Sequence, residues 1–105
     1  MEPKEIERTL VRLYILFDAA KEPIDGSGIT EKLRERRLTT SLGSVRRILR
    51  ELETKGYLVS HEVRNSRSHR MYAATPAGRL RIKDAKKKIR ALIGIFGRPE
   101  LFPLE

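Results

Sequence analysis

The stretch of sequence that decides the fold runs from residue 41 to residue 78 and reads SLGSVRRILRELETKGYLVSHEVRNSRSHRMYAATPAG. It begins with Ser41, a residue type that caps helices, and a helical pattern continues to Gly56, since glycine readily adopts the left-handed angles that end a helix. The spacing then becomes that of strands, near residues 57–59 and again near 71–73. Apolar residues at helical spacing share one side of the predicted helix: Val45, Ile48, Leu49 and Leu52.

Arginines lie away from the apolar side of this helix, which is predicted over about residues 41–55. At roughly 100° per residue, Arg47 and Arg50 fall on the opposite side and Arg46 falls on a flank. A helix of this kind suits the major groove of DNA, where the forked donors of arginine match the two acceptors of guanine. The alternative is an ordinary solvated face shared with the acidic residues of the same helix.

Two serines, Ser41 and Ser44, lie near the start of the helix. Free amide groups and the helix dipole favour a phosphate there. The predicted contacts of this helix with DNA are therefore Ser41, Ser44, Arg46, Arg47 and Arg50.

The predicted hairpin, over about residues 57–74, has a basic tip. Its turn is formed by residues 65–68, and the arginines around that turn are Arg64, Arg67 and Arg70. A flexible basic loop of this kind could contact the minor groove or its phosphates. A solvated hairpin is the alternative reading.

Two further helices are predicted before residue 41. The first runs from Pro3 to about Lys21 and carries one stripe of apolar residues, namely Ile6, Leu10, Leu13, Tyr14 and Phe17. The second follows Asp25, a plausible N-cap, and runs to about Arg36.

A last helix is predicted from the cap Thr75 and the following proline to about Phe96. Its apolar residues recur at spacings of three and four, as in a coiled coil: Ile82, Ala85, Ile89, Leu92 and Phe96. We expect this seam, with Leu10 and Phe17 of the first helix, to form a dimer interface. The alternative is that the last helix packs back on the first within a monomer.

The predicted fold is therefore mainly α with a small β-hairpin, a winged helix-turn-helix with an N-terminal helix and a C-terminal dimerisation helix. We expect residues 1–74 to form the DNA-binding domain, residues 75–97 to form the dimerisation helix on the same domain, and residues 98–105 to form a tail.

The sequence resembles the PadR-like family of winged-helix transcriptional regulators, in the short type with one C-terminal helix. The resemblance covers about residues 8 to 96 and is carried by these motifs: Pro23-Ile24-Asp25-Gly26; Gly43-Ser44-Val45 with Leu49, Leu52-Glu53 and Gly56-Tyr57-Leu58-Val59; and Tyr72 with Thr75-Pro76-Ala77-Gly78-Arg79. It implies a homodimeric repressor that binds an inverted-repeat operator and places its recognition helix in the major groove of that operator. The sequence departs from the family pattern at Arg46, where the family has a tyrosine, and at Ala74, where leucine is frequent.

The net charge of the 105-residue chain is +9, and all of it lies after residue 40. Residues 1–40 carry 8 basic and 8 acidic residues, whereas residues 41–105 carry 15 and 6, which leaves 15 − 6 = +9. A neutral segment followed by a basic one predicts a partner with a phosphate backbone. No apolar run is long enough to cross a bilayer and the start is too charged for a signal peptide, so we expect a soluble cytoplasmic protein with no membrane partner.

The residue types argue against an enzyme, a metal site or a cofactor. The chain has no cysteine, and the spacing of its two histidines, His61 and His69, with Glu62 matches no standard metal site. No serine nucleophile with a histidine base and no glycine-rich phosphate loop is evident. Double-stranded DNA and a second copy of the chain are the expected partners, with an unidentified small-molecule effector in an apolar dimer cleft near Phe17 and Phe96 as a further hypothesis. The alternatives are a sequence-tolerant architectural DNA- or RNA-binding protein and a winged-helix protein-interaction module.

Overall fold

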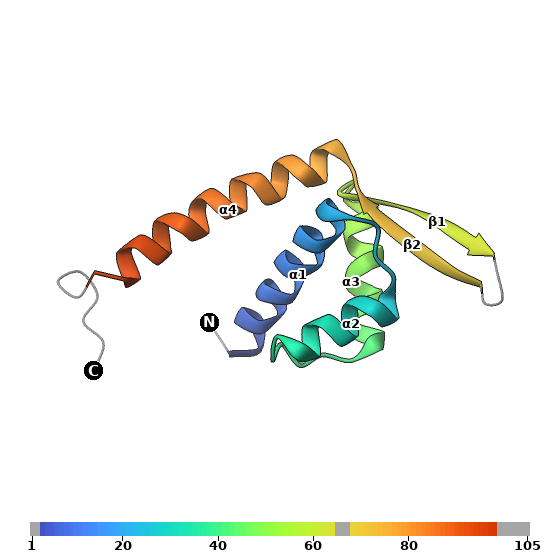
Figure 1. Ribbon diagram of the computed structural model, residues 1–105, viewed down its shortest axis with the longest axis horizontal. Coiled ribbons are helices and arrows are strands. Elements are labelled where there is room, and N and C mark those ends of the chain that lie inside the picture. The colour runs from blue at the N-terminus through green and yellow to red at the C-terminus, as the bar shows by residue number, and fades with distance from the viewer. Residues whose placement is uncertain (1–2, 65–67, 99–105) are drawn as a thin grey trace.

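The computed structural model describes residues 3–64 and 68–98. Along the chain lie α1 (Pro3–Lys21), α2 (Gly26–Glu35), α3 (Leu42–Thr54), β1 (Leu58–Arg64), β2 (Ser68–Ala74) and α4 (Pro76–Phe96). Figure 1 shows α1, α2 and α3 gathered together, with the hairpin and α4 extending in opposite directions. This is the predicted winged helix-turn-helix.

The helix boundaries follow from the caps that the sequence offers. The side chains of Asp25, Ser41 and Thr75 each accept a hydrogen bond from the backbone N–H three residues later, at the starts of α2, α3 and α4. Gly56 adopts a φ of +84°, as its predicted role after α3 requires. The expected helix starts are thus confirmed.

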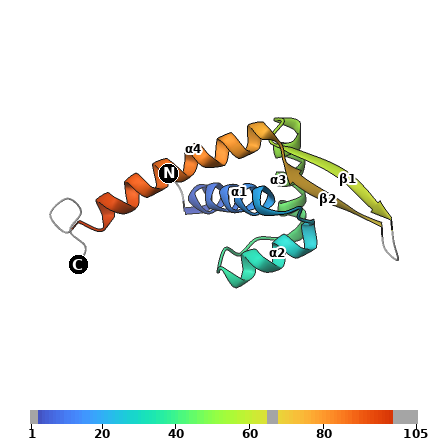
Figure 2. The same ribbon diagram turned by 45° about the horizontal axis from the view of Figure 1, so that its top comes forward.

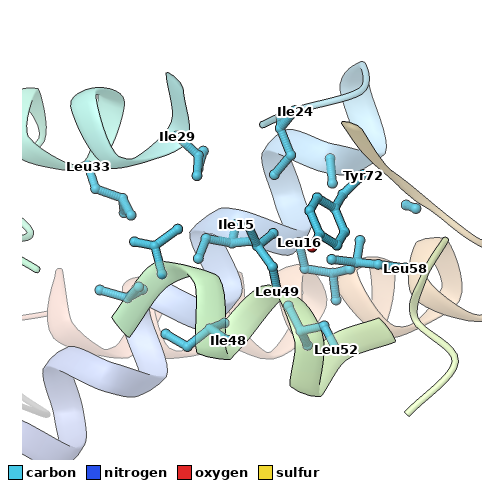
Figure 3. Close-up of a cluster of buried hydrophobic side chains, with 14 of the residues drawn as sticks. Ile15, Leu16, Ile24, Ile29, Leu33, Ile48, Leu49, Leu52, Leu58 and Tyr72 are labelled. Atoms are coloured by element: carbon cyan, nitrogen blue, oxygen red, sulfur yellow. The ribbon is translucent and has the colours of Figure 1, made fainter. Parts of the chain in front are cut away.

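The core is formed where α1, α2 and α3 meet under the base of the hairpin (Figure 3). The largest fully buried side chains are Ile15, Ile29, Leu33, Val45 and Leu49. The predicted apolar side of α3 is confirmed, because all four of its apolar residues are buried. The outward side of α3 is thereby fixed.

The hairpin strands are longer than the predicted 57–59 and 71–73. They pair antiparallel from Leu58 opposite Ala74 to Arg64 opposite Ser68. Backbone pairing continues through polar residues, which give no apolar alternation to read. A third short segment joins them, since Ile24 and Tyr72 exchange two backbone hydrogen bonds of 2.9 and 2.7 Å.

The stripe predicted on α1 is not the side that faces the core. The buried residues of α1 are Val11, Ile15, Leu16, Asp18 and Ala19, whereas Ile6 and Leu10 are exposed. Leu13, Tyr14 and Phe17 are half-buried and pack against the edge of the core. Helix α1 has apolar residues on two sides, and the elements that pack against it, mainly α4 and β2, leave Ile6 and Leu10 exposed.

Helix α4 leaves the domain after about its first three turns, as Figures 1 and 2 show from two directions. Ile82 is 6% exposed and belongs to the core, and Ala85 packs partly against it. Every residue from 86 to 98 is exposed, including Leu92 at 49% and Phe96 at 48%. The protruding helix gives the chain its longest dimension of 56 Å, against 27 and 21 Å in the other directions.

Candidate nucleic-acid interface

The outward side of α3 presents Arg46, Arg47 and Arg50, all exposed. Ser41 Oγ accepts from the backbone N–H of Ser44 and donates to Ser44 Oγ at 3.0 Å, so both serines are used in the cap. Their hydroxyls nevertheless lie at the surface beside the first turn of α3. Four of the five residues predicted on this helix are therefore exposed, and Ser44 is half-buried.

The arginines of α3 divide between two grooves. Arg46 and Arg50 line a pocket of about 230 Å³ with Arg70 of β2 and with Gly26 and Ser27, the first residues of α2. We call this the wing-side groove. Its carboxylate, Asp25, is the N-cap of α2 and accepts from Gly28 N at 3.2 Å.

Arg47 lies in the other groove, together with Ser41 and Ser44. That groove has a volume of about 440 Å³ and separates α3 from the N-terminal half of α1. We call it the α1-side groove. The sequence treats Arg47 and Arg50 as one outward pair, but the structure places them beside different neighbours.

The carboxylates of α3 bond to residues of other elements rather than to its own arginines. Glu51 pairs with Arg12 of α1 at 2.9 Å, and Glu53 accepts two hydrogen bonds from Ser60 of β1. Among the described residues no hydrogen bond or ion pair engages Arg46, Arg47 or Arg50. The DNA-binding interpretation of this surface stays a prediction, and so does the solvated-face alternative.

A relay of side chains ties the base of the wing to α3. Ser60 N and Oγ donate to Glu53 Oε2 at 3.0 and 2.6 Å, and Arg70 donates to Ser60 Oγ at 3.0 Å. Arg70 is thus an exposed cation whose position is fixed by the wing itself. The sequence gives Glu53 no such role, because no pattern reveals which strand residue would face it.

Of the other two predicted wing residues, Arg64 and Arg67, the structure describes only Arg64. Arg64 is exposed near the end of β1 and pairs with Glu62 at 3.4 Å. Arg67 lies outside the described residues. In the part of the chain that is described, no group of three or more His, Cys, Asp or Glu residues could hold a metal ion.

A buried carboxylate fixes α2 against α1. Asp18 is 4% exposed and accepts from Lys32 Nζ at 3.0 Å, which joins the two helices behind the recognition surface. This hydrogen bond, and then the negative charge of Asp18, raise the pKa of Lys32 above its ordinary value of 10.5. Lys32 therefore stays charged across the physiological range.

The residues predicted at a dimer interface fall into two groups. Ile82 and Ala85 are already used in packing within one chain, which leaves Ile82 little surface for a second copy. Phe17 lies between α1 and α4, with the ammonium groups of Lys21 and Lys86 each 4.8 Å from its ring centroid. The remaining predicted interface residues are exposed: Leu10, Ile89, Leu92 and Phe96.

Comparison with known proteins relates this arrangement to regulators of transcription. Over 90 residues the chain is 36% identical to transcriptional regulator Rv3488 of Mycobacterium tuberculosis, a match that covers 85% of this chain and 84% of the relative. A PadR-like transcriptional regulator from Bacillus cereus has the same fold, with a TM-score of 0.77 at 16% identity over 86% of this chain and 90% of its own. The structure of Bacillus subtilis PadR in complex with operator DNA superimposes with a TM-score of 0.66 at 19% identity, over 71% of this chain and 45% of that protein.

No helix in the described part of the chain is long and apolar enough to cross a membrane. The model of the transcriptional regulator PadR-like family matches residues 13–84, which is more than half of the chain. This span contains all of α2, α3 and the wing. The chain therefore belongs to the PadR-like family of transcriptional regulators.

Proposed function

We propose that the chain is a homodimeric, sequence-specific DNA-binding regulator that places α3 in the major groove and the wing beside it. The observation that carries this proposal is that Arg46, Arg47 and Arg50 of α3 have no partner among the described residues. The carboxylates of α3 bond to Arg12 and Ser60 instead. Arginines held at a surface without internal partners are available for phosphates and base edges. The complex of Bacillus subtilis PadR with operator DNA supports the same partner for this fold.

The two faces of the wing-side groove support a division of labour between α3 and the wing. Arg46 and Arg50 are one turn apart on α3, and Arg70 approaches from β2. A helix in the major groove reads base edges with its side chains, while flanking basic residues bind phosphates and fix the register. We assign base reading to the outward side of α3, and phosphate binding to the serines at its start and to the wing.

Dimerisation is proposed from the exposed apolar surface of α4. Ile89 and Leu92 are 38% and 49% exposed on the protruding part of α4, and Leu10 of α1 is 44% exposed. Leaving such side chains in water is costly, since burying one fully contributes roughly 1.5–3 kcal/mol. A second copy, pairing through α4 and α1, would bury this surface and present two recognition helices to an inverted repeat.

The dimer proposal is tested with Leu92→Asp. A charge in the pairing surface should shift the protein to monomer in analytical ultracentrifugation at micromolar concentration. Ala91→Asp is the comparison variant. It introduces the same charge at an exposed position on the same turn, but it removes only a small apolar side chain. A Leu92→Asp protein that remains dimeric would remove the assignment.

The regulatory reading is repression from a site near the protein's own gene, in the cytoplasm where the DNA is accessible. The test is a titration of labelled duplex from immediately upstream of that gene, against a shuffled duplex of equal composition, near physiological salt. A preference of about a hundredfold or more is expected for a specific regulator. Equal binding to both duplexes would favour an architectural protein, and binding to neither would favour a protein-interaction module.

A further inference from the structure

The α1-side groove is lined by basic residues, most of which come from the segment 1–40, whose net charge is zero. The N-terminal half of α1 contributes Lys4 and Arg8, which lie about one turn apart at i and i+4, and α3 contributes Arg47. Hydroxyls of residues 39–41 and 44 complete that side of the groove. Because residues 1–40 sum to zero charge, nothing in the sequence marks Lys4 and Arg8 as special.

The α1-side groove has a net positive charge, because the ion pair between Arg12 and Glu51 in its lining is neutral. Arg12 and Glu51 also line it but neutralise each other across 2.9 Å. Lys4, Arg8 and Arg47 remain, and no ion pair engages them within the described residues. One further carboxylate, Glu7, faces the same groove, so the lining keeps a net charge of +2 from three cations and one anion.

The position of this groove relative to α3 indicates what it could bind. A helix in the major groove is bordered by two phosphate backbones, one along each side. The wing-side groove borders α3 on one side with Arg46, Arg50 and Arg70. The α1-side groove borders α3 on the other side and meets it at Arg47.

We propose that the α1-side groove binds the second phosphate backbone of double-stranded DNA, with Lys4 and Arg8 as phosphate-binding residues. The proposal rests on the proposed function, since it assumes that α3 enters the major groove. It extends the DNA-binding surface from α3 and the wing to α1. The DNA-binding protein thus contacts both strands that border its recognition helix, and Glu7 opposes that contact.

The test is the double variant Lys4→Ala/Arg8→Ala, titrated into the upstream duplex and the shuffled duplex at several salt concentrations. Each lost phosphate contact should reduce the slope of log affinity against log salt by about 0.9, so four contacts in a dimer give a fall of up to about 3.6. At about 0.1 M salt one contact corresponds to roughly an eightfold change in affinity, and the double variant should lose at least that much. The loss should be equal for both duplexes, because phosphates carry no sequence information.

The matched control is Lys87→Ala/Arg90→Ala, which removes the same two residue types from exposed positions on the protruding part of α4. It lowers the net charge equally but should leave the salt slope close to that of the wild type. Glu7→Gln removes a negative charge from the groove and should therefore tighten binding to both duplexes. Helix content by circular dichroism shows that each variant is folded.

The outcomes separate this proposal from the one on which it rests. If the wild type binds DNA and Lys4→Ala/Arg8→Ala binds as the control does, the α1-side groove is not a phosphate site. A loss confined to the upstream duplex would equally overturn the assignment to phosphates. If the wild type binds neither duplex, the proposed function itself fails.

Discussion

Helix α4 approaches the rest of the domain closely at Gly78. A Cβ placed there would stand 2.1 Å from the carbonyl oxygen of Tyr57 and 3.3 Å from a methyl of Leu16. The same carbonyl accepts a hydrogen bond of 3.0 Å from Thr75 N, at the start of α4. Gly78→Ala therefore forces two backbone segments apart exactly where α4 leaves the wing.

The size of the effect follows from these distances. Carbon and oxygen need at least about 3.2 Å, so the backbone must move by roughly 1 Å, which in a packed core costs about 1–3 kcal/mol. Weakening the Thr75–Tyr57 hydrogen bond adds about 1 kcal/mol, and the gain of alanine over glycine in a helix offsets about the same amount. We expect Gly78→Ala to lower the free energy of unfolding by about 1–3 kcal/mol.

Gly94 provides the control on the same helix, because nothing lies within 4 Å of its Cβ position. Gly94→Ala should stabilise the protein by up to about 1 kcal/mol through helix propensity alone. Both variants are compared with the wild type by urea unfolding at one fixed protein concentration, since dimerisation couples stability to concentration. A Gly78→Ala protein as stable as the wild type would refute the close-approach argument.

Three further predictions concern α3, the wing and α2. Arg50→Ala should reduce the preference for the upstream duplex by roughly 1–3 kcal/mol in a binding titration if α3 reads bases, and unchanged preference would count against that reading. Glu53→Ala should destabilise the fold by about 1–3 kcal/mol in urea, because Ser60 loses the acceptor of two hydrogen bonds, whereas Glu53→Gln keeps an acceptor and should lose less. Lys32→Met should lower the free energy of unfolding at neutral pH, because Asp18 loses its charged partner. The pKa of Lys32 is raised in the folded protein, so the stabilisation by Lys32 is complete below pH 10.5 and is lost as the pH rises beyond that value. The difference in stability between Lys32→Met and the wild type should therefore shrink in alkaline solution. A difference independent of pH up to strongly alkaline conditions would contradict this account of the pair with Asp18.

The sequence predicts those parts of the fold that local chemistry determines. The caps Asp25, Ser41 and Thr75 each act on an amide three residues away, so their effect is legible without tertiary structure. The buried side of α3 is equally legible, because its other side is wholly polar.

Helix α1 shows where such reasoning ends. It carries apolar residues on two sides, and only the packing of its neighbours decides that Val11 and Ile15 are buried while Ile6 and Leu10 stay exposed. The pairing of Ile24 with Tyr72 involves a single residue on one side, which is too short to show any periodicity.

The candidate site follows the same division. The exposed arginines of α3 are predicted from the helical wheel, but their separation into two grooves depends on α1 and β2, which are distant in sequence. The link from Glu53 to Ser60 depends on the angle between wing and helix, and Lys4 and Arg8 are hidden in a segment whose charges sum to zero.

In the proposed dimer, the length of the protruding α4 sets the distance between the two recognition helices. Its 21 residues span about 32 Å at 1.5 Å per residue, and it begins at the corner that joins it to the wing. Inserting one residue in its exposed half would shift the pairing surface by about 1.5 Å and rotate it by about 100°, while leaving every base contact intact. In the proposed dimer, the length of α4 would then set the spacing of the two operator half-sites and α3 would set their sequence, so the two properties could change independently.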